Sequence, residues 1–540
     1  MNFDIQDTRR FGSQAFQALQ YVVVGLIAIL TATWLPHYLT WPLWPDAHAY
    51  ASLAIGWDQG IEPYRDVATF NFPGQIYLFW ILGKIFGWGV TWPFYAADAA
   101  LIAIVGAFMI VWSRRVFGER LSGLIGLLAL AVVLLDLDIS QAGQRDWHST
   151  AFVMISLMVL QCGQSRFRFV WSAVFFAAGF VFRPHVVLFG PAIIAAIALE
   201  KYDPKQRALK PFVSTCILWG FVFAACLVAG FLPLISHGLF GAFLDDLKIA
   251  RHGGSYAAMT LKTALVLFLA KFVMREYLLM IVATLTLAFR SGRNSTRVVL
   301  PWTVALIFAL AYQSVHPISH DYLMLPMKTI YAVNLAILAA LVRESLGRET
   351  LQAAGISAAV VLLAMNKWPD ECSPQAALRS TRAFLTGSGD VDVPHGARRY
   401  FQPGEVDVSE RRSGYPWADY VATIEYLKAK TTPHTYVAGA FKRMPFPSLN
   451  GPTGRPSPWP GEGGTTFLLV LGLEKEERFI KALLNAPEDT VVVWVPGERA
   501  EADRVNFERL DRTIAENFAP EASFGIFQIY RRIPAGKKNP

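Results

Sequence analysis

The sequence predicts a polytopic α-helical membrane protein with about eleven transmembrane helices, followed by an α/β domain outside the cytoplasm. Apolar residues make up 54% of the 540-residue chain, which holds 38 phenylalanines. They gather in repeated blocks up to residue 366, and several blocks reach the roughly 20 residues that a helix needs to cross a hydrocarbon core. No such block follows Trp368. We therefore expect a transmembrane domain over residues 1–366 and an extracytoplasmic domain over residues 367–540.

Each long apolar block predicts one spanning helix. The first block is long and lacks a small-residue cleavage site, so we expect it to remain as an anchor. The apolar run 75–87 is too short to span, and we expect it to form a helix lying on the outer surface. The predicted spans are residues 17–36, 93–113, 120–137, 147–162, 169–182, 185–200, 211–235, 277–290, 298–313, 322–343 and 351–366.

The basic residues predict how these helices are oriented. A net charge of +8 would suggest nucleic-acid binding in a soluble protein, but here the basic residues lie in short loops between apolar blocks. Sixteen Lys and Arg residues fall in the N-terminus and the loops on its side, against about nine in the longer opposite loops. By the positive-inside rule the N-terminus is cytoplasmic. An odd number of spans then places the C-terminal domain outside, as in a multi-pass protein of a bacterial inner membrane, and no nucleic-acid partner is expected.

The chain after residue 367 has the pattern of a small α/β domain. Helical and strand-like stretches alternate along it, which is typical of such domains. We expect helices at 416–430, 475–486 and 502–517, and strands at 435–439, 489–497 and 523–532. This tail holds no constellation of residues typical of catalysis, and a stabilising or acceptor-guiding role is expected for it.

Ionisable residues gather in five segments that the predicted topology places on the outer side. An arginine next to an aspartate there could be a local ion pair, and polarity near Pro184 could reflect a hydrated helix break. Five such segments on one face nevertheless favour chemistry on a charged, membrane-anchored substrate over transport, which typically uses ionisable groups near the bilayer midplane. The segments are 37–92 with Asp46, 140–150 with Arg145 and Asp146, 182–186 with Arg183, 245–256 with Arg251, and 314–326 with His320 and Tyr322.

The order of these motifs resembles that of polytopic glycosyltransferases of the GT-C fold. An aspartate soon after the first helix is followed by Tyr50, by PYRD (63–66) and by FPGQIYLF (72–79). The resemblance continues through QRD (144–146), FRP (182–184) and HDYLMLP (320–326), so it covers the whole membrane half. The closest branch in pattern contains the protein O-mannosyltransferases and the aminoarabinose transferases that modify lipid A.

The resemblance implies a GT-C-like transmembrane domain that moves a sugar from a polyprenyl-phosphate carrier on the outer leaflet to an acceptor hydroxyl, usually with inversion. The acceptor would belong to a lipid, a cell-envelope polysaccharide or a protein. Asp46 would be the first-loop acid and general base, and Asp146 the second acid. Arg183, with Arg145 and Arg251 in reserve, would hold the donor phosphate. The substrate-binding residues implied are Tyr50, Tyr64, Arg65, His320 and Tyr322.

One departure from the family pattern concerns a metal. The first-loop acid is often followed by a second acid, whereas Ala47 and His48 follow Asp46 here. A divalent metal could be held by Asp46, His48 and His320, although no HExxH or comparable spacing is present and no cofactor is certain.

Two other functions remain open at this point. A transporter or lipid flippase is expected to carry internal repeats, and none is evident in the sequence. A catalytically inactive membrane scaffold would leave the five charged outer segments without a role.

Overall fold

The structure is a computed structural model of the whole chain. It describes residues 5–43, 46–69, 71–135, 137, 139, 141–162, 165, 167–201, 209–252, 275–291, 293–312, 321–346, 374–386, 400–402, 414–442, 447–461, 466, 469, 475–498 and 507–534. The predicted span 351–366 and the expected domain boundary at 366/367 lie outside these residues.

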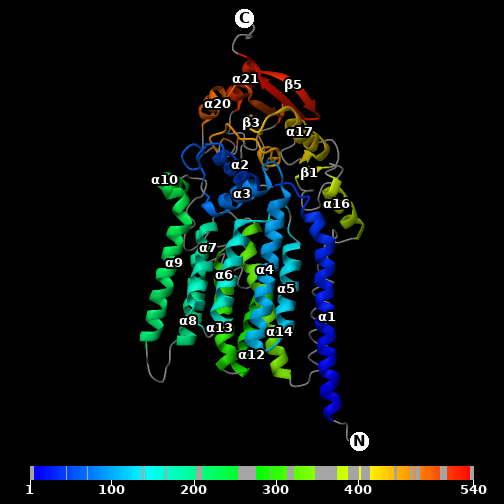
Figure 1. Cartoon of the computed structure of the whole chain (residues 1–540), viewed down its shortest axis with the longest axis vertical. Helices are drawn as coiled ribbons and strands as arrows, with labels where there is room; N and C mark the ends of the chain where they lie inside the picture. The colour runs from blue at the N-terminus through cyan, green and yellow to red at the C-terminus, as the bar shows by residue number, and fades with distance from the viewer. Residues whose placement is uncertain are drawn as a thin grey trace.

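A bundle of long helices forms the first part of the molecule (Figure 1). Within the described residues, six helices are long and apolar enough to cross a membrane, and three shorter apolar helices accompany them. The chain is thus an integral membrane protein with multiple spanning helices, while the total of eleven stays a prediction. The bundle consists of α1 (Ile5–Tyr38), α4 (Trp92–Phe117), α5 (Leu121–Leu135), α6 (Arg145–Cys162), α7 (Phe167–Phe182), α8 (Gly190–Lys201), α9 (Lys210–Ser236), α12 (Arg275–Ser291), α13 (Arg293–Tyr312) and α14 (Leu325–Leu346).

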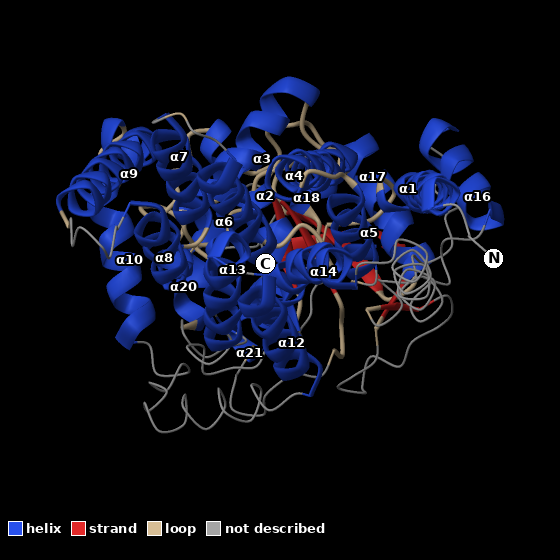
Figure 2. Ribbon diagram, turned by 90° about the horizontal axis from the view of Figure 1, so that it is seen from below, coloured by secondary structure: helices blue, strands red, loops and turns tan. Residues whose placement is uncertain are grey.

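Small residues let neighbouring helices of the bundle approach closely. A Cβ atom on Gly123 of α5 would lie 2.6 Å from the Met109 carbonyl oxygen of α4, and one on Gly179 of α7 would lie 2.8 Å from the Ser149 carbonyl oxygen of α6. Helices in lipid lack a hydrophobic force between them, so close backbone packing and interhelical hydrogen bonds hold them together. Seen from the N-terminal end, the helices stand nearly end-on, with α1 and α9 at opposite sides (Figure 2).

The N-terminus lies at one end of the bundle, and we call the opposite end the outer end (Figure 1). Here the first predicted outer loop folds into two helices, α2 (Asp46–Asp58) and α3 (Pro73–Phe86). Two 3-10 helices, η1 (Pro184–Phe189) and η3 (Asp321–Met324), and the helix α10 (Phe240–His252) also belong to connections at this end. The run 75–87, expected to form a short non-spanning helix, indeed does so as α3.

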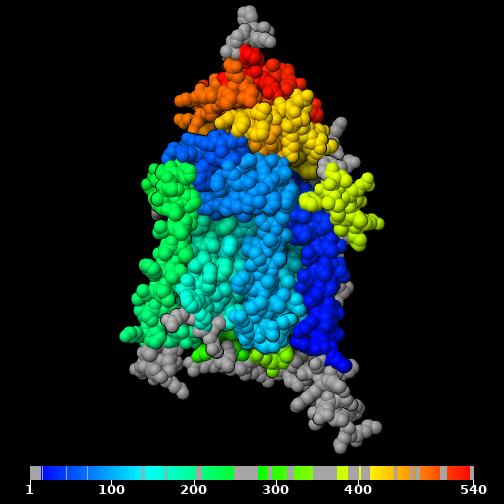
Figure 3. Space-filling view, in the orientation of Figure 1, coloured from blue at the N-terminus to red at the C-terminus, as the bar shows by residue number. Residues whose placement is uncertain are grey.

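The C-terminal α/β unit caps the outer end (Figures 1 and 3). Its four-stranded sheet has the order β3-β4-β6-β5, with β3 (Val437–Ala440) parallel to β4 (Val491–Trp494) and the other pairs antiparallel. β1 (Phe401–Gln402) and β2 (Tyr415–Pro416) form a separate parallel pair. Its helices are α17 (Trp417–Lys430), α18 (Asn450–Thr453), α20 (Glu476–Asn485) and α21 (Glu508–Asn517).

Two sequence expectations need correction in these elements, and one helix is additional to those expected. The single final strand expected at 523–532 is a hairpin, in which β5 (Phe518–Phe524) turns at Gly525 into β6 (Phe527–Arg532). The helix expected from residue 185 begins as a 3-10 helix and becomes α-helical only at Gly190. The amphipathic helix α16 (Pro374–Thr386) had not been expected at all.

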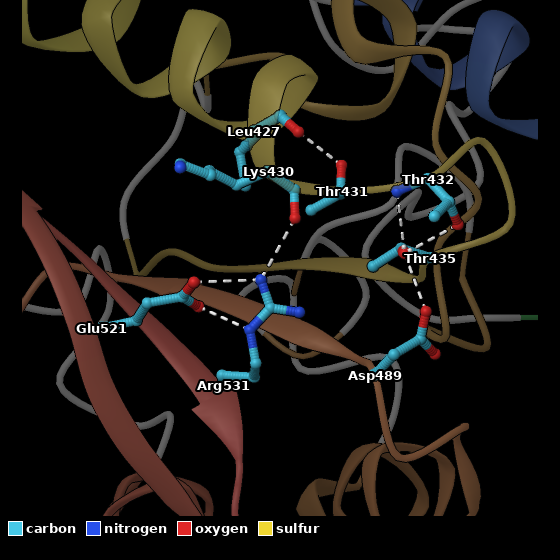
Figure 4. Close-up of polar contacts among 8 residues, drawn as sticks. All are labelled: Leu427, Lys430, Thr431, Thr432, Thr435, Asp489, Glu521 and Arg531. Carbon is cyan, nitrogen blue, oxygen red and sulfur yellow. Dashed lines mark hydrogen bonds and ion pairs between the residues drawn. The ribbon is translucent and has the colours of Figure 1, made fainter.

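Polar contacts lock α17 to the sheet of the α/β unit (Figure 4). Arg531 of β6 donates from Nε and Nη2 to the two carboxylate oxygens of Glu521 on β5, at 2.7 and 3.0 Å, and from Nη2 to the Lys430 carbonyl at 3.3 Å. In the turn after α17, the Thr435 hydroxyl donates to Asp489 at 2.7 Å. The end of α17, the hairpin and the segment before β4 are therefore fixed to one another.

The α/β unit rests directly on the first outer loop. Ala68 pairs with Gly461 in an isolated parallel bridge, and the Ala68 amide donates to the Pro460 carbonyl at 3.0 Å. The Gln59 side chain donates to the Pro433 carbonyl at 2.9 Å. A Cβ atom on Gly454 would lie 2.8 Å from the amide nitrogen of Gly89, so the two backbones touch. The loop that carries Asp46 is thus held between the bundle and the α/β unit.

Candidate active site at the outer end of the bundle

Asp46 and Arg145 face each other from the first residues of two helices. Asp46 begins α2, and its Oδ2 accepts a hydrogen bond from Gln144 Nε2 at 3.3 Å. Arg145 begins α6, and its guanidinium carbon lies 5.8 Å from the centre of the Tyr50 ring. Arg145 also interacts electrostatically with Asp46 and with Asp146. The motif QRD therefore meets the aspartate of the first outer loop, as the sequence suggested.

Asp146 is fully buried between an arginine and a tyrosine. Its Oδ1 accepts a hydrogen bond from the Tyr312 hydroxyl at 2.6 Å and lies 2.9 Å from Arg183 Nε. Arg183 is 4% exposed and occupies the break between α7 and η1, where Pro184 ends the regular helix. Its backbone is extended at φ −156°, which directs the chain into η1. Tyr312 is the last residue of α13, so three helix ends meet at this carboxylate.

Tyr322 of η3 completes a group that we call the charge cluster, made of Asp46, Arg145, Asp146, Arg183, Tyr312 and Tyr322. The Tyr322 side chain interacts electrostatically with both aspartates and both arginines of the cluster. Two carboxylates and two guanidiniums leave it without formal net charge. It gathers elements that are more than 270 positions apart in the sequence.

Some buried polar atoms of the charge cluster make no hydrogen bond to the described part of the chain. Within the described residues, Asp146 Oδ2, Arg145 Nε and Arg183 Nε have no hydrogen-bond partner. The 2.9 Å contact of Arg183 Nε with Asp146 is an ion pair whose N–H does not point at the oxygen. Buried polar atoms are satisfied in most native structures, and exceptions need an explanation. The arginine N–H groups fit an anionic oxygen, and Asp146 Oδ2 fits a hydroxyl donor.

A second set of polar side chains lies beneath the charge cluster, and we call it the buried network. His148 Nε2 lies 2.7 Å from Asp98 Oδ1, and His148 Nδ1 lies 3.0 Å from Gln75 Oε1. The Tyr38 hydroxyl donates to Asp98 Oδ2 at 2.6 Å, and Gln75 Nε2 donates to the Gly143 carbonyl at 2.9 Å.

These hydrogen bonds also fix the orientation of the Gln75 amide. Because the Gln75 amide nitrogen is committed to Gly143, its oxygen must face His148. Both imidazole nitrogens of His148 then face oxygen atoms, Nδ1 that of Gln75 and Nε2 that of Asp98. The network ties α1, α3, α4 and α6 to Gly143, and it supports the start of α6, where Arg145 and Asp146 lie.

The other predicted site residues occupy different positions. Tyr50 belongs to the edge of the charge cluster through Arg145, and its hydroxyl donates to the Asn71 side chain at 3.3 Å. Tyr64 is buried with φ +69° and donates to the Asn71 carbonyl at 2.8 Å. Arg65 pairs with Glu62 and donates to the Gly238 carbonyl at 3.1 Å, so it binds the first loop to the turn after α9.

Of the predicted metal ligands, Asp46 and His48 lie within the described part of the chain. His48 is buried on α2, and burial lowers its pKa to about 4, so it is neutral at physiological pH. Among the residues that the structure describes, no three His, Cys, Asp or Glu side chains are placed to hold a metal ion. His320 lies outside those residues, as does the side chain of Arg251.

Sequence reasoning had not included Tyr312, Gln75 or Asp98 among the site residues. Tyr312 closes an apolar block and resembles an ordinary interfacial aromatic residue. Asp98 could have been included, because it lies near the outer end of a predicted span. An ionisable residue inside a span is a candidate for a functional site.

Comparison with known proteins was informative only at the level of structure. No protein-family model matches the sequence, and no curated protein matches it significantly. The crystal structure of ArnT from Cupriavidus metallidurans bound to undecaprenyl phosphate superimposes with a TM-score of 0.55 at 14% identity, covering 95% of this chain and 98% of ArnT. The chain has the fold of ArnT. The apo ArnT structure agrees, with a TM-score of 0.58 at 13% identity over 97% of this chain and 100% of ArnT. The resemblance to GT-C enzymes of the polyprenyl-phosphate type is thereby confirmed at the level of the fold, including the C-terminal α/β region.

Proposed function

We propose that this protein is an integral membrane glycosyltransferase that moves a sugar from a polyprenyl-phosphate-linked donor to an acceptor hydroxyl at the outer face. The observation that carries this proposal is the charge cluster, in which two arginines with unused N–H groups lie beside two aspartates at the outer end of the bundle. The ArnT fold supports it, since an ArnT structure holds undecaprenyl phosphate. The basic loops at the N-terminal end support an extracytoplasmic position for the cluster.

In the proposed reaction the acceptor oxygen attacks the anomeric carbon of the sugar while the bond from that carbon to the phosphate oxygen breaks. The electron pair of the broken bond leaves with the polyprenyl phosphate, and attack from the opposite side inverts the configuration. Arg183 and Arg145 bind the phosphate and stabilise its growing negative charge, a contribution that is often the largest in such reactions. Protonation of the leaving group is not required.

Asp46 takes the proton of the acceptor hydroxyl in this proposal. It is only partly buried, and its Oδ2 receives a hydrogen bond from Gln144. Among the described residues no hydrogen bond occupies Oδ1, which we assign to the acceptor. Asp146 fits a positioning role, because its Oδ1 is engaged by Arg183 and Tyr312 and it orients the arginine. Tyr322 and Tyr50 are assigned to substrate contacts at the rim of the cluster.

The proposal is tested with purified protein, polyprenyl-phospho-sugars and candidate acceptors, with product measured by mass spectrometry. Asp46→Asn is expected to reduce transfer by about 10²- to 10⁴-fold, the usual contribution of a general base. Binding of undecaprenyl phosphate, followed by thermal shift, should be retained. The matched control is Asp245→Asn, which alters an exposed carboxylate of α10 that pairs with Lys248. Transfer by Asp46→Asn within a few-fold of wild type would exclude Asp46 as the base. Donor binding without any transfer would favour a transporter.

A further inference from the structure

Helix α16 exposes large apolar side chains at the outer end of the molecule. Leu378 is 72% exposed and Leu385 is 75% exposed, and their spacing of seven residues places them on one face of the helix. Phe384 on the adjoining flank is 38% exposed. Single exposed apolar residues are ordinary on a protein surface, but an exposed apolar stripe on an amphipathic helix indicates contact with another apolar phase.

The opposite face of α16 fixes the helix at the level where two long helices end. Ser380 and Ala383 are buried, and the Ser380 hydroxyl lies 3.2 Å from His37 Nδ1 in the last turn of α1. The Phe384 ring lies 6.1 Å from the ring of Trp92, the first residue of α4. In Figure 1 the helix lies beside the outer end of α1, and in Figure 3 it protrudes from the side of the molecule. Tryptophan is enriched at this level in membrane proteins, where hydrocarbon meets headgroups.

The apolar surface of α16 continues onto α3. Trp92 also contacts the Phe86 ring at 5.1 Å, and α3 exposes Ile81, Ile85 and Phe86. Directly below, α1 and α4 expose further apolar side chains along their spanning segments, among them Val22, Ile29, Ile104 and Val111. Through Phe384 and Trp92, α16 therefore adjoins α3 and α4, which also expose apolar side chains.

The charges of α16 match the outer surface of a bilayer. Its thirteen residues include Arg379 and Arg382, both exposed, and no acidic residue. Basic side chains beside an apolar stripe favour phospholipid headgroups, since each Lys or Arg near an anionic surface adds attraction.

We propose that α16 is a membrane-surface helix whose apolar face enters the outer leaflet. Leu378 and Leu385 lie among the upper acyl-chain segments, and Arg379 and Arg382 lie at the level of the lipid phosphates. Through α16 the polypeptide that leads into the α/β unit is attached to the bilayer. This inference does not depend on the proposed sugar transfer.

The test measures how deeply single labelled residues enter the lipid bilayer when the protein is reconstituted in vesicles. Cys162, Cys216, Cys226 and Cys372 are replaced by serine, and one cysteine is introduced in each variant and labelled with a fluorophore. The variants are Leu378→Cys, Leu385→Cys and Arg382→Cys, with Ala515→Cys on the exposed surface of α21 as the control. The vesicles contain phosphatidylethanolamine and phosphatidylglycerol with a quencher on either the acyl chains or the headgroup.

Acyl-chain quenchers are expected to lower the fluorescence at positions 378 and 385 by at least twofold. The headgroup quencher should act more strongly at position 382, and neither should affect position 515. Absence of acyl-chain quenching at 378 and 385 would overturn the proposal, because the apolar face would then be covered by another segment of this chain or lie in water. Stronger headgroup than acyl-chain quenching at 385 would also overturn it.

Discussion

Replacing His148 with leucine is expected to destabilise the protein strongly by leaving a buried carboxylate unpaired. His148 and Asp98 are 2% and 3% exposed, and their facing atoms lie 2.7 Å apart. After the substitution, the Tyr38 hydroxyl would be the only described side chain still bonded to Asp98. Removing one partner of a buried ion pair typically costs about 3–5 kcal/mol of the free energy of unfolding. The second substitution Asp98→Asn in the same background removes the charge and should restore about 2 kcal/mol or more.

The free energy of unfolding can be followed by tryptophan fluorescence during denaturation in detergent micelles, since the chain holds 16 tryptophans. Tyr38→Phe serves as the control, because it deletes one hydrogen bond worth about 1 kcal/mol and keeps the ion pair. The reasoning fails if His148→Leu costs less than about 1 kcal/mol, or if the double variant is no more stable than the single one. Either result would mean that the contact between Asp98 and His148 does not stabilise the fold.

Three further predictions follow from named contacts. Gly74→Ala should cost about 1–3 kcal/mol, because its Cβ would lie 2.9 Å from the Phe182 backbone, whereas Gly220→Ala, with nothing within 4 Å, should leave the thermal midpoint unchanged or raised. His48 has a folded pKa of about 4, below its unfolded value of about 6.5, so it favours the fold above pH 6.5 and this contribution is lost as the pH falls toward 4. Lowering the pH from 7 to 5 should cost about 2 kcal/mol through this residue, and His48→Gln should show a correspondingly flatter pH profile of stability. Arg183→Gln should weaken binding of undecaprenyl phosphate at least about tenfold in a thermal-shift titration. Arg183→Lys should weaken it less, because lysine keeps the charge but not the planar fork of donors. Equal binding by the wild type and both variants would remove Arg183 from the phosphate site.

The parts of the fold that follow from periodicity could be predicted, and those that follow from tertiary contacts could not. Long apolar blocks indicated the helices of the bundle. In the C-terminal part, the succession of helix-like and strand-like stretches indicated α17, β3, α20 and β4. Most of the strand β5 was not predicted, because the majority of its side chains are exposed and because it contains Pro520. A strand at the edge of a sheet tolerates proline. The helix α2 could not be predicted within the first outer loop, because its apolar residues show almost no helical periodicity. Nearly every side of this helix is buried.

The same division holds for the candidate site. Asp46, Arg145, Asp146 and Arg183 could be grouped from the sequence, because the topology brings charged segments to one end. Their order around Asp146 could not, since it depends on where α7 breaks and where α13 ends. The buried hydrogen bonds of Gln75 and Tyr38 could not be predicted, because an amide and a phenol acquire a role only from the partner that the fold places beside them.

The bridge between Ala68 and Gly461 also constrains when the first outer loop can reach its final structure. The two residues lie nearly four hundred positions apart, so the loop that carries Asp46 is synthesised long before the segment that covers it. Such distant pairings form late, since their loop-closure entropy is compensated only after other contacts exist. Truncation before residue 461 should therefore leave a bundle whose first outer loop lacks this pairing.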